Sequence, residues 1–119
     1  MTKEKILVVD DDPDISMMIK MMLEYKGYSV AVADRAEIAE QMLPADDFKL
    51  IIMDMLLSGS NGVDVCMRLK KDGQLSRIPI IMISAHPNAK TVCINAGADD
   101  FIAKPFDMEE MLNAIRKFV

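Results

Sequence analysis

The chain has 119 residues, of which 51% are hydrophobic and 28% charged, proportions typical of one compact globular domain and not of a disordered segment. Its net charge of -5 argues against direct binding to nucleic acid, because phosphate recognition requires clustered Lys and Arg. The sequence contains no run near the roughly 20 apolar residues that span a bilayer, and its first apolar run is too short for a signal peptide. We therefore expect a cytoplasmic protein without membrane contact.

Short apolar runs alternate with amphipathic stretches along the whole chain. The apolar runs predict five strands, at residues 6–9, 28–33, 50–53, 78–83 and 100–103. The intervening stretches predict five helices, at about residues 13–26, 35–44, 63–71, 88–96 and 108–119. This alternation predicts an α/β fold, with helices on both faces of a parallel five-stranded sheet. No linker or repeat divides the sequence, so we expect a single domain over residues 1–119.

Three of the predicted helices begin with a capping signal. Asp12 precedes a proline, which is tolerated in the first helical turn. Asp34 is followed three positions later by Glu37, and Asp107 is followed in the same way by Glu110. These patterns predict that all three aspartates cap helices. For Asp12, the capping role explains why a third carboxylate follows Asp10 and Asp11.

The first predicted helix is rich in methionine. Four of its apolar residues share one helical face and are predicted to be core: Ile15, Met18, Ile19 and Met22. Met17 and Met21 point elsewhere, and exposed methionines often serve adaptable partner surfaces.

The two cysteines, Cys66 and Cys93, both lie in apolar helical contexts. Unpaired cysteine is usually a small buried residue, and nothing marks the chain as secreted. Two free buried thiols are therefore expected, with a disulfide as the alternative.

Polar side chains follow four of the five predicted strands. Asp10 and Asp11 follow the first strand, Asp54 the third, Ser84 the fourth and Lys104 the fifth. Because parallel strands end at the same edge of a sheet, three carboxylates, a hydroxyl and an ammonium should converge there. Carboxylates placed together repel unless a hard divalent cation lies among them, which indicates a site for Mg²⁺ or Mn²⁺.

These strand ends carry the motifs ILVVDD, LIIMD, IMIS-A and GADDFIAKPF, in that order. The combination resembles the receiver domain of bacterial and archaeal two-component response regulators, and the match covers the whole chain. The resemblance implies a flavodoxin-like (CheY-like) doubly wound sheet of order 2-1-3-4-5. It also implies a phosphoprotein that acts in signal transduction or a phosphorelay, with self-catalysed phosphotransfer and autodephosphorylation as its only chemistry.

The resemblance assigns the central role to Asp54, as the acceptor of a phosphoryl group from a histidine kinase or phosphotransfer protein. It implies that Asp11 and Asp54 ligate Mg²⁺ directly, that Asp10 acts through water, and that the backbone carbonyl of Leu56 is a further ligand.

Other residues of the same motifs respond to the phosphoryl group. The resemblance implies that Lys104 pairs with a phosphoryl oxygen and that the peptide bond before Pro105 is cis. Ser84 is expected to bond another phosphoryl oxygen, while Phe101 rotates into the space that Ser84 leaves. The same likeness suggests that His86 tunes the phosphoryl lifetime and that Met17 and Met21 contact the kinase.

Several features leave alternatives open. The family usually has Met-Pro where Leu57-Ser58 stands here, and the segment between Ser84 and Gly97 is about two residues short, which predicts a truncated fourth helix. The output partner is unknown, and either a monomer or a phosphorylation-dependent dimer is compatible with the sequence. No effector domain follows Val119, so the chain is a stand-alone receiver or one domain of a longer regulator or hybrid kinase.

Two other functions compete with the phospho-accepting switch. A pseudo-receiver that acts as an interaction module without phosphorylation is disfavoured by the intact acceptor set. An aspartyl-phosphate hydrolase of the haloacid-dehalogenase type requires a second aspartate where Leu56 stands, so its general acid is missing.

Overall fold

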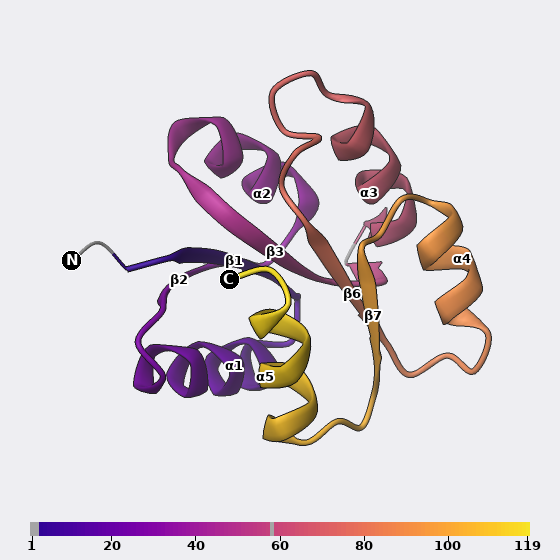
Figure 1. Ribbon diagram of the computed structural model, residues 1–119. Coiled ribbons are helices and arrows are strands. Elements are labelled where there is room, and N and C mark those ends of the chain that lie inside the picture. Colours follow the sequence, from indigo (N-terminus) through magenta and orange to yellow (C-terminus); the bar gives the residue numbers. More distant parts are fainter. Residues whose placement is uncertain (1–2, 58) are drawn as a thin grey trace.

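The computed structural model describes residues 3–57 and 59–119 (Figure 1). Ser58, one of the two residues that depart from the family pattern, lies outside this range. Five parallel strands form one sheet in the order β2-β1-β3-β6-β7, which confirms the predicted topology. The bounds of these strands are Lys5–Val9 (β1), Ser29–Ala33 (β2), Phe48–Asp54 (β3), Ile80–Ser84 (β6) and Asp100–Ala103 (β7).

The helices follow the strands as predicted. Their bounds are Pro13–Tyr25 (α1), Ala36–Met42 (α2), Gly62–Lys71 (α3), Ala89–Asn95 (α4) and Met108–Arg116 (α5), with a 3₁₀ turn at Leu43–Ala45 (η1). In the described part of the chain, no helix has the length and apolar character needed to cross a membrane. The fourth helix, α4, has only seven residues, in line with the short segment seen in the sequence.

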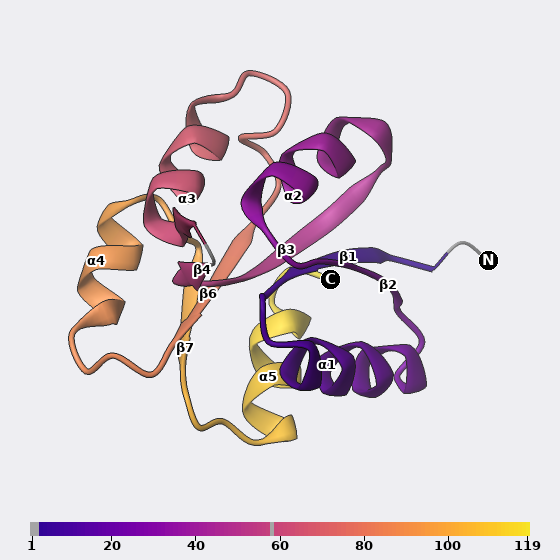
Figure 2. The same cartoon turned by 180° about the vertical axis from the view of Figure 1, so that it is seen from behind.

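Helices cover both faces of the sheet. Helices α1 and α5 lie on one face, and α2, α3 and α4 lie on the other (Figures 1 and 2). Strand side chains alternate between two apolar clusters, with Leu7 and Val9 facing α2–α4 and Ile6 and Val8 facing α1 and α5. Because the central strands are buried on both faces, they read in the sequence as continuous apolar runs.

Two of the three predicted caps are confirmed. The Asp12 carboxylate accepts the backbone N–H groups of the first turn of α1, and Asp107 forms a complete capping box with Glu110 at the start of α5. The prediction for Asp34 was wrong, since Arg35 is the N-cap of α2 and provides no side-chain hydrogen bond. The carboxylate of Asp34 instead pairs with the guanidinium of Arg35, at 3.1 Å from Nε to Oδ1, and so does not reach the helix amides.

The predicted core face of α1 was wrong at Met18. That side chain is exposed, and Ser16 is buried instead, alongside Ile19 and Met22. The hydroxyl of Ser16 donates to the backbone carbonyl of Pro13 at 3.3 Å, so a polar residue is accommodated inside without an unpaired donor. The buried face of α1 is therefore formed by Ser16, Ile19, Met22 and Leu23, and not by the face that apolarity alone favours.

The region between β3 and α3, where the sequence predicts neither a strand nor a helix, contains an additional hairpin. Strands β4 (Leu56–Leu57) and β5 (Ser60–Asn61) pair antiparallel. Two-residue strands lack the periodicity that reveals longer ones, which explains why the sequence did not indicate them. Cys66 and Cys93 are both buried and free, as predicted.

Candidate functional site

The polar strand ends gather where the order of the sheet reverses. Asp10 follows β1, Asp54 ends β3, Ser84 ends β6 and Lys104 follows β7. These four strands are successive neighbours in the sheet. In open α/β sheets, ligands bind in the crevice beyond the carboxyl ends of the strands at this switch point. The tertiary structure therefore brings together side chains that the sequence places on four separate motifs.

The Lys104 ammonium bridges the two buried carboxylates. Its Nζ lies 2.7 Å from Asp54 Oδ2 and 3.7 Å from Asp10 Oδ2. Burial alone would lower the pKa of Lys104, but the hydrogen bond to Asp54 and the charges of Asp54 and Asp10 outweigh it and raise that pKa. Lys104 thus remains a cation whose charge is directed at Asp54.

Asp54 has a defined orientation. Its Oδ2 accepts from Lys104, and its Oδ1 accepts from the backbone N–H of Leu56 at 3.1 Å. The Leu56 side chain is exposed, while its backbone lies beside the carboxylate through the β4 strand. This hydrogen bond fixes the Asp54 side chain at the mouth of the crevice.

Asp10 is the buried carboxylate of the site, with 2% of its surface exposed. Its Oδ1 accepts the backbone N–H of Asp12 at 2.9 Å, whereas its Oδ2 has no hydrogen-bond partner among the described residues. Burial raises the pKa of Asp10. The hydrogen bond from the Asp12 N–H and the charge of Lys104 lower that pKa by less, so the net shift is upward. A buried carboxylate oxygen without a donor is the group that a divalent cation would satisfy.

Asp11 lies differently from its neighbour. Its side chain is exposed, and it lines a hollow together with Asp34, Arg35 and Gly59. Over residues 3–57 and 59–119, no three His, Cys, Asp or Glu side chains are close enough together to hold one metal ion. Mg²⁺ commonly takes only one or two carboxylates and keeps several waters, so Asp10 and Asp54 suit its chemistry.

The residues predicted to respond to a phosphoryl group lie around this centre. Ser84 is buried, and its Oγ accepts the backbone N–H of His86 at 3.0 Å. His86 is exposed, and its Nδ1 accepts the backbone N–H of Asn88 at 3.2 Å. Phe101 is partly buried against the cluster of α2–α4. The Lys104–Pro105 peptide is cis, as expected.

One residue of the site was missed in the sequence. The position of Gly62 at the start of α3 leaves no room for a side chain, because a Cβ atom there would collide with the backbone carbonyls of Asp54 and Met55. Its N–H donates to the Met55 carbonyl at 2.7 Å. A glycine after a short polar loop was the only signal, and many turns carry the same one.

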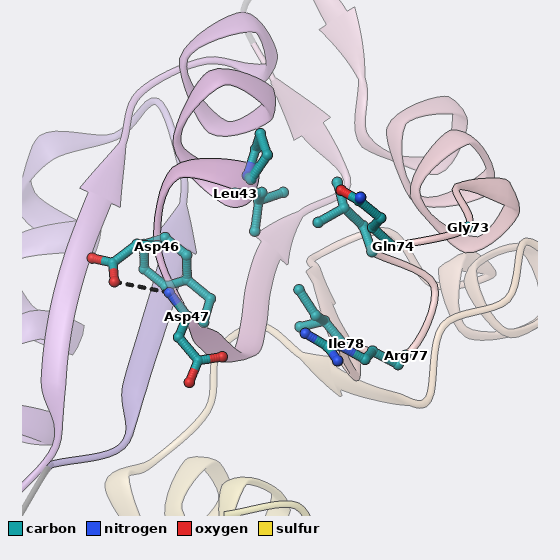
Figure 3. Close-up of a pocket in the computed structure, with 10 residues that line it drawn as sticks. Leu43, Asp46, Asp47, Gly73, Gln74, Arg77 and Ile78 are labelled. Atoms are coloured by element: carbon teal, nitrogen blue, oxygen red, sulfur yellow. Dashed lines mark hydrogen bonds between the residues drawn. The ribbon is translucent and has the colours of Figure 1, made fainter.

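A separate hollow of about 430 Å³ lies at the opposite edge of the sheet, near the amino ends of β3 and β6 (Figure 3). Asp46 and Asp47 stand on one side of it and Arg77 on the other. The two aspartates are already paired, with Lys5 at 2.6 Å and Lys49 at 3.0 Å. None of the residues predicted for the functional site lines this hollow.

A doubly wound parallel sheet with this strand order defines the flavodoxin-like class of α/β folds. Known proteins identify the family. The model of the response regulator receiver domain matches residues 6–116, and the chain belongs to this family.

A relative from Synechocystis sp., the DNA-binding dual master transcriptional regulator RpaA, is 38% identical over 118 residues, which cover 94% of this chain and 47% of the relative. The chain thus spans about half the length of that curated relative. Because RpaA is named as DNA-binding, the comparison does not support the expectation that this protein has no contact with nucleic acid.

Two solved structures superimpose closely. A putative response regulator from Chloroflexus aurantiacus has a TM-score of 0.94 and 31% identity, with 98% of each chain covered. The receiver domain of the sensor histidine kinase PA1611 from Pseudomonas aeruginosa has a TM-score of 0.89 and 26% identity, again with 98% of each chain covered. That second structure is described with a magnesium ion coordinated in its active-site cleft.

Proposed function

We propose that this protein is a phospho-accepting switch in which Asp54 takes a phosphoryl group from the phosphohistidine of a histidine kinase or phosphotransfer protein. The observation that carries the proposal is the 2.7 Å contact of Lys104 with Asp54 at the switch point of the sheet. Membership of the receiver family supports the same reaction.

The reaction is a displacement at phosphorus. A carboxylate oxygen of Asp54 forms the new P–O bond while the P–N bond of the phosphohistidine breaks, and the imidazole leaves with the electron pair. Such transfers depend on positioning and charge neutralisation more than on covalent assistance. Leu56 N–H orients the attacking carboxylate, and the Lys104 ammonium neutralises charge on the transferred group.

Asp54, the backbone carbonyl of Leu56 and Asp10 would hold a Mg²⁺ or Mn²⁺ ion, and the exposed side chain of Asp11 would have to turn toward them to become the direct ligand that the family resemblance implies. Two observations support this assignment. Asp10 Oδ2 accepts no hydrogen bond among the described residues, and a magnesium ion is described in the similar PA1611 receiver. When bound, the ion would neutralise the negative charge shared by the carboxylates and the phosphoryl group.

Phosphorylation would be read out through Ser84 and Phe101. A phosphoryl group adds about -1.5 to -2 charges and strong acceptor oxygens, which attract a hydroxyl donor. Ser84 Oγ accepts a backbone hydrogen bond and retains its own proton, so it is free to donate to a phosphoryl oxygen. Phe101 would then move toward the space beside Ser84, changing the surface formed with α4 and α5.

Met17 and Met21 would contact the phosphoryl donor, because both are exposed on α1. Replacing both with Glu should slow transfer from a phosphohistidine protein and leave labelling by acetyl phosphate unchanged. The matched control is Met67→Glu, which alters an exposed methionine on α3 and should affect neither reaction. Equal loss in both assays would rule out a docking role.

The test of the whole proposal is intact mass after incubation with acetyl phosphate and Mg²⁺. The wild-type chain should gain about 80 Da, the mass of one phosphoryl group, and Asp54→Ala should gain none. An adduct on both proteins would refute Asp54 as the acceptor. Failure of the wild type with both acetyl phosphate and a phosphohistidine donor would refute the switch and favour a phosphorylation-independent interaction module.

A further inference from the structure

The exposed methionines are gathered on one face of the molecule. Met17, Met18 and Met21 on α1 and Met108 at the start of α5 are each 51–64% exposed, and all four line one hollow of about 600 Å³. The two helices lie side by side on the same face of the sheet in both views (Figures 1 and 2). In the described part of the chain, Met67 is the one other exposed methionine. We call these four residues the methionine groove.

The methionine groove continues to the candidate site. Met18 also lines a second hollow, of about 320 Å³, whose walls include Lys104, Pro105 and Phe106. Lys104 in turn holds Asp54. The two hollows therefore extend from α1 to Lys104, the residue that contacts Asp54, and a protein that presents phosphohistidine to Asp54 would cover them.

We propose that the methionine groove is a modification site for peroxides, and that its oxidation to methionine sulfoxide reversibly prevents docking of the phosphoryl donor. The inference rests on the proposed function, because it needs a donor protein that contacts this face. Hydrogen peroxide or an organic hydroperoxide is the co-reactant. The thioether sulfur attacks the terminal OH oxygen of the peroxide, an S–O bond forms and the O–O bond breaks. The proton of the attacked oxygen passes to the departing oxygen, which leaves as water or an alcohol. The sulfur is oxidised by two electrons and the peroxide is reduced.

Oxidation would change the chemistry of the groove and spare the fold. A sulfoxide is polar and strongly hydrated, so covering it with an apolar partner surface carries a desolvation cost that the thioether does not have. The methionines of the core, Met53, Met82 and Met111, are fully buried and inaccessible to peroxide. The groove thus contains oxidisable sulfur at the surface while the sulfur inside is protected.

The experiment treats the folded chain with limiting hydrogen peroxide and maps sulfoxide by peptide mass spectrometry. Met17, Met18, Met21 and Met108 should oxidise well before Met53, Met82 and Met111. Transfer from a phosphohistidine protein, chosen because it labels the untreated chain, should then slow by about tenfold. Labelling by acetyl phosphate should stay unchanged, and methionine sulfoxide reductases should restore transfer.

Two variants separate the groove from other methionines. Replacing all four groove residues with Leu removes the oxidisable sulfur and keeps the surface apolar. Transfer to this variant, measured against its own rate before treatment, should not respond to peroxide. Met67→Leu should leave the sensitivity of transfer to peroxide intact. Transfer that survives complete oxidation of the groove, or that is lost on peroxide treatment of the Leu variant, overturns the inference. Absence of labelling by both acetyl phosphate and a phosphohistidine protein before any peroxide is added would refute the proposed function instead.

Discussion

Lys104 Nζ donates a 2.7 Å hydrogen bond to Asp54 Oδ2, although the two residues are 50 positions apart in the chain. Neutralising this lysine tests its part in the reaction. Lys104→Met should slow acetyl phosphate labelling of Asp54 by roughly 10²-fold, the usual loss when one preorganised charge is removed from a transition state. Labelling is measured by intact mass over time.

The matched control for that variant is Lys117→Met. Lys117 also pairs with an aspartate, at 3.0 Å from Asp100, but it is exposed near the end of α5. Its loss should leave the labelling rate within about twofold of wild type, since surface ion pairs contribute little. Equal slowing in the two variants would show that net charge, and not the contact with Asp54, controls the rate.

Asp10→Asn should stabilise the protein in the absence of divalent cations. The substitution removes a buried negative charge whose Oδ2 lacks a hydrogen-bond partner among the described residues. We expect the free energy of unfolding in urea to rise by about 1–2 kcal/mol. Mg²⁺ should stabilise the wild type more than the variant, because only the wild type retains the full carboxylate pair.

The control for Asp10 is Asp14→Asn, which neutralises an exposed carboxylate in the first turn of α1. Its effect should stay within about 0.5 kcal/mol, as for most surface changes. If Asp10→Asn is less stable than wild type in the absence of cations, the buried charge of Asp10 does not destabilise the fold, and the prediction is contradicted.

Gly62→Ala should displace the end of β3. The new Cβ atom would collide with the backbone carbonyls of Asp54 and Met55, so the acceptor must shift or the helix start must move. We expect a loss of roughly 1–3 kcal/mol in stability together with slower phosphorylation of Asp54. Gly73→Ala is the paired control, because an added Cβ there meets no atom within 4 Å. Comparable losses in both variants would contradict this steric explanation.

Alkaline pH should destabilise the fold through Cys66. Burial raises the pKa of this thiol from 9.0 to about 11. Between these values the unfolded chain loses the thiol proton while the folded chain keeps it, so stability falls as pH rises through this window. The slope of unfolding free energy against pH should be shallower in Cys66→Ala. Rapid alkylation of the native wild-type thiols at pH 8 would contradict their burial.

His86→Ala should change the lifetime of the phosphoryl group on Asp54. The backbone N–H of His86 donates to Ser84 Oγ, which is proposed to bond a phosphoryl oxygen, and its exposed ring accepts the backbone N–H of Asn88. Removing the ring deletes the second of these contacts, so hydrolysis of phosphorylated Asp54 should differ between the variant and wild type. Decay is followed by intact mass in both proteins. Equal decay rates would exclude this role.

Much of the fold could be predicted because apolar runs and helical periodicity report burial directly. The strand order, the cap at Asp12 and the capping box at Asp107 were all predicted correctly. The predictions for Asp34 and Met18 were wrong because a contact with a nearby residue, which the sequence pattern does not reveal, determined the structure. Arg35 draws Asp34 away from the helix amides, and a hydrogen bond to Pro13 allows Ser16 to take a core position that apolarity assigned to Met18.

The sequence by itself determined which residues end each parallel strand, since a buried strand must be apolar until it reaches the sheet edge. It therefore indicated Asp54 and Lys104 as members of one site. Only the tertiary structure decided that Asp10 is buried, with an Oδ2 that accepts no hydrogen bond from the residues the structure describes, while Asp11 is exposed. Adjacent residues in a chain point in different directions as it leaves a strand, and the packing of the neighbouring strands and loops decides which of them is covered.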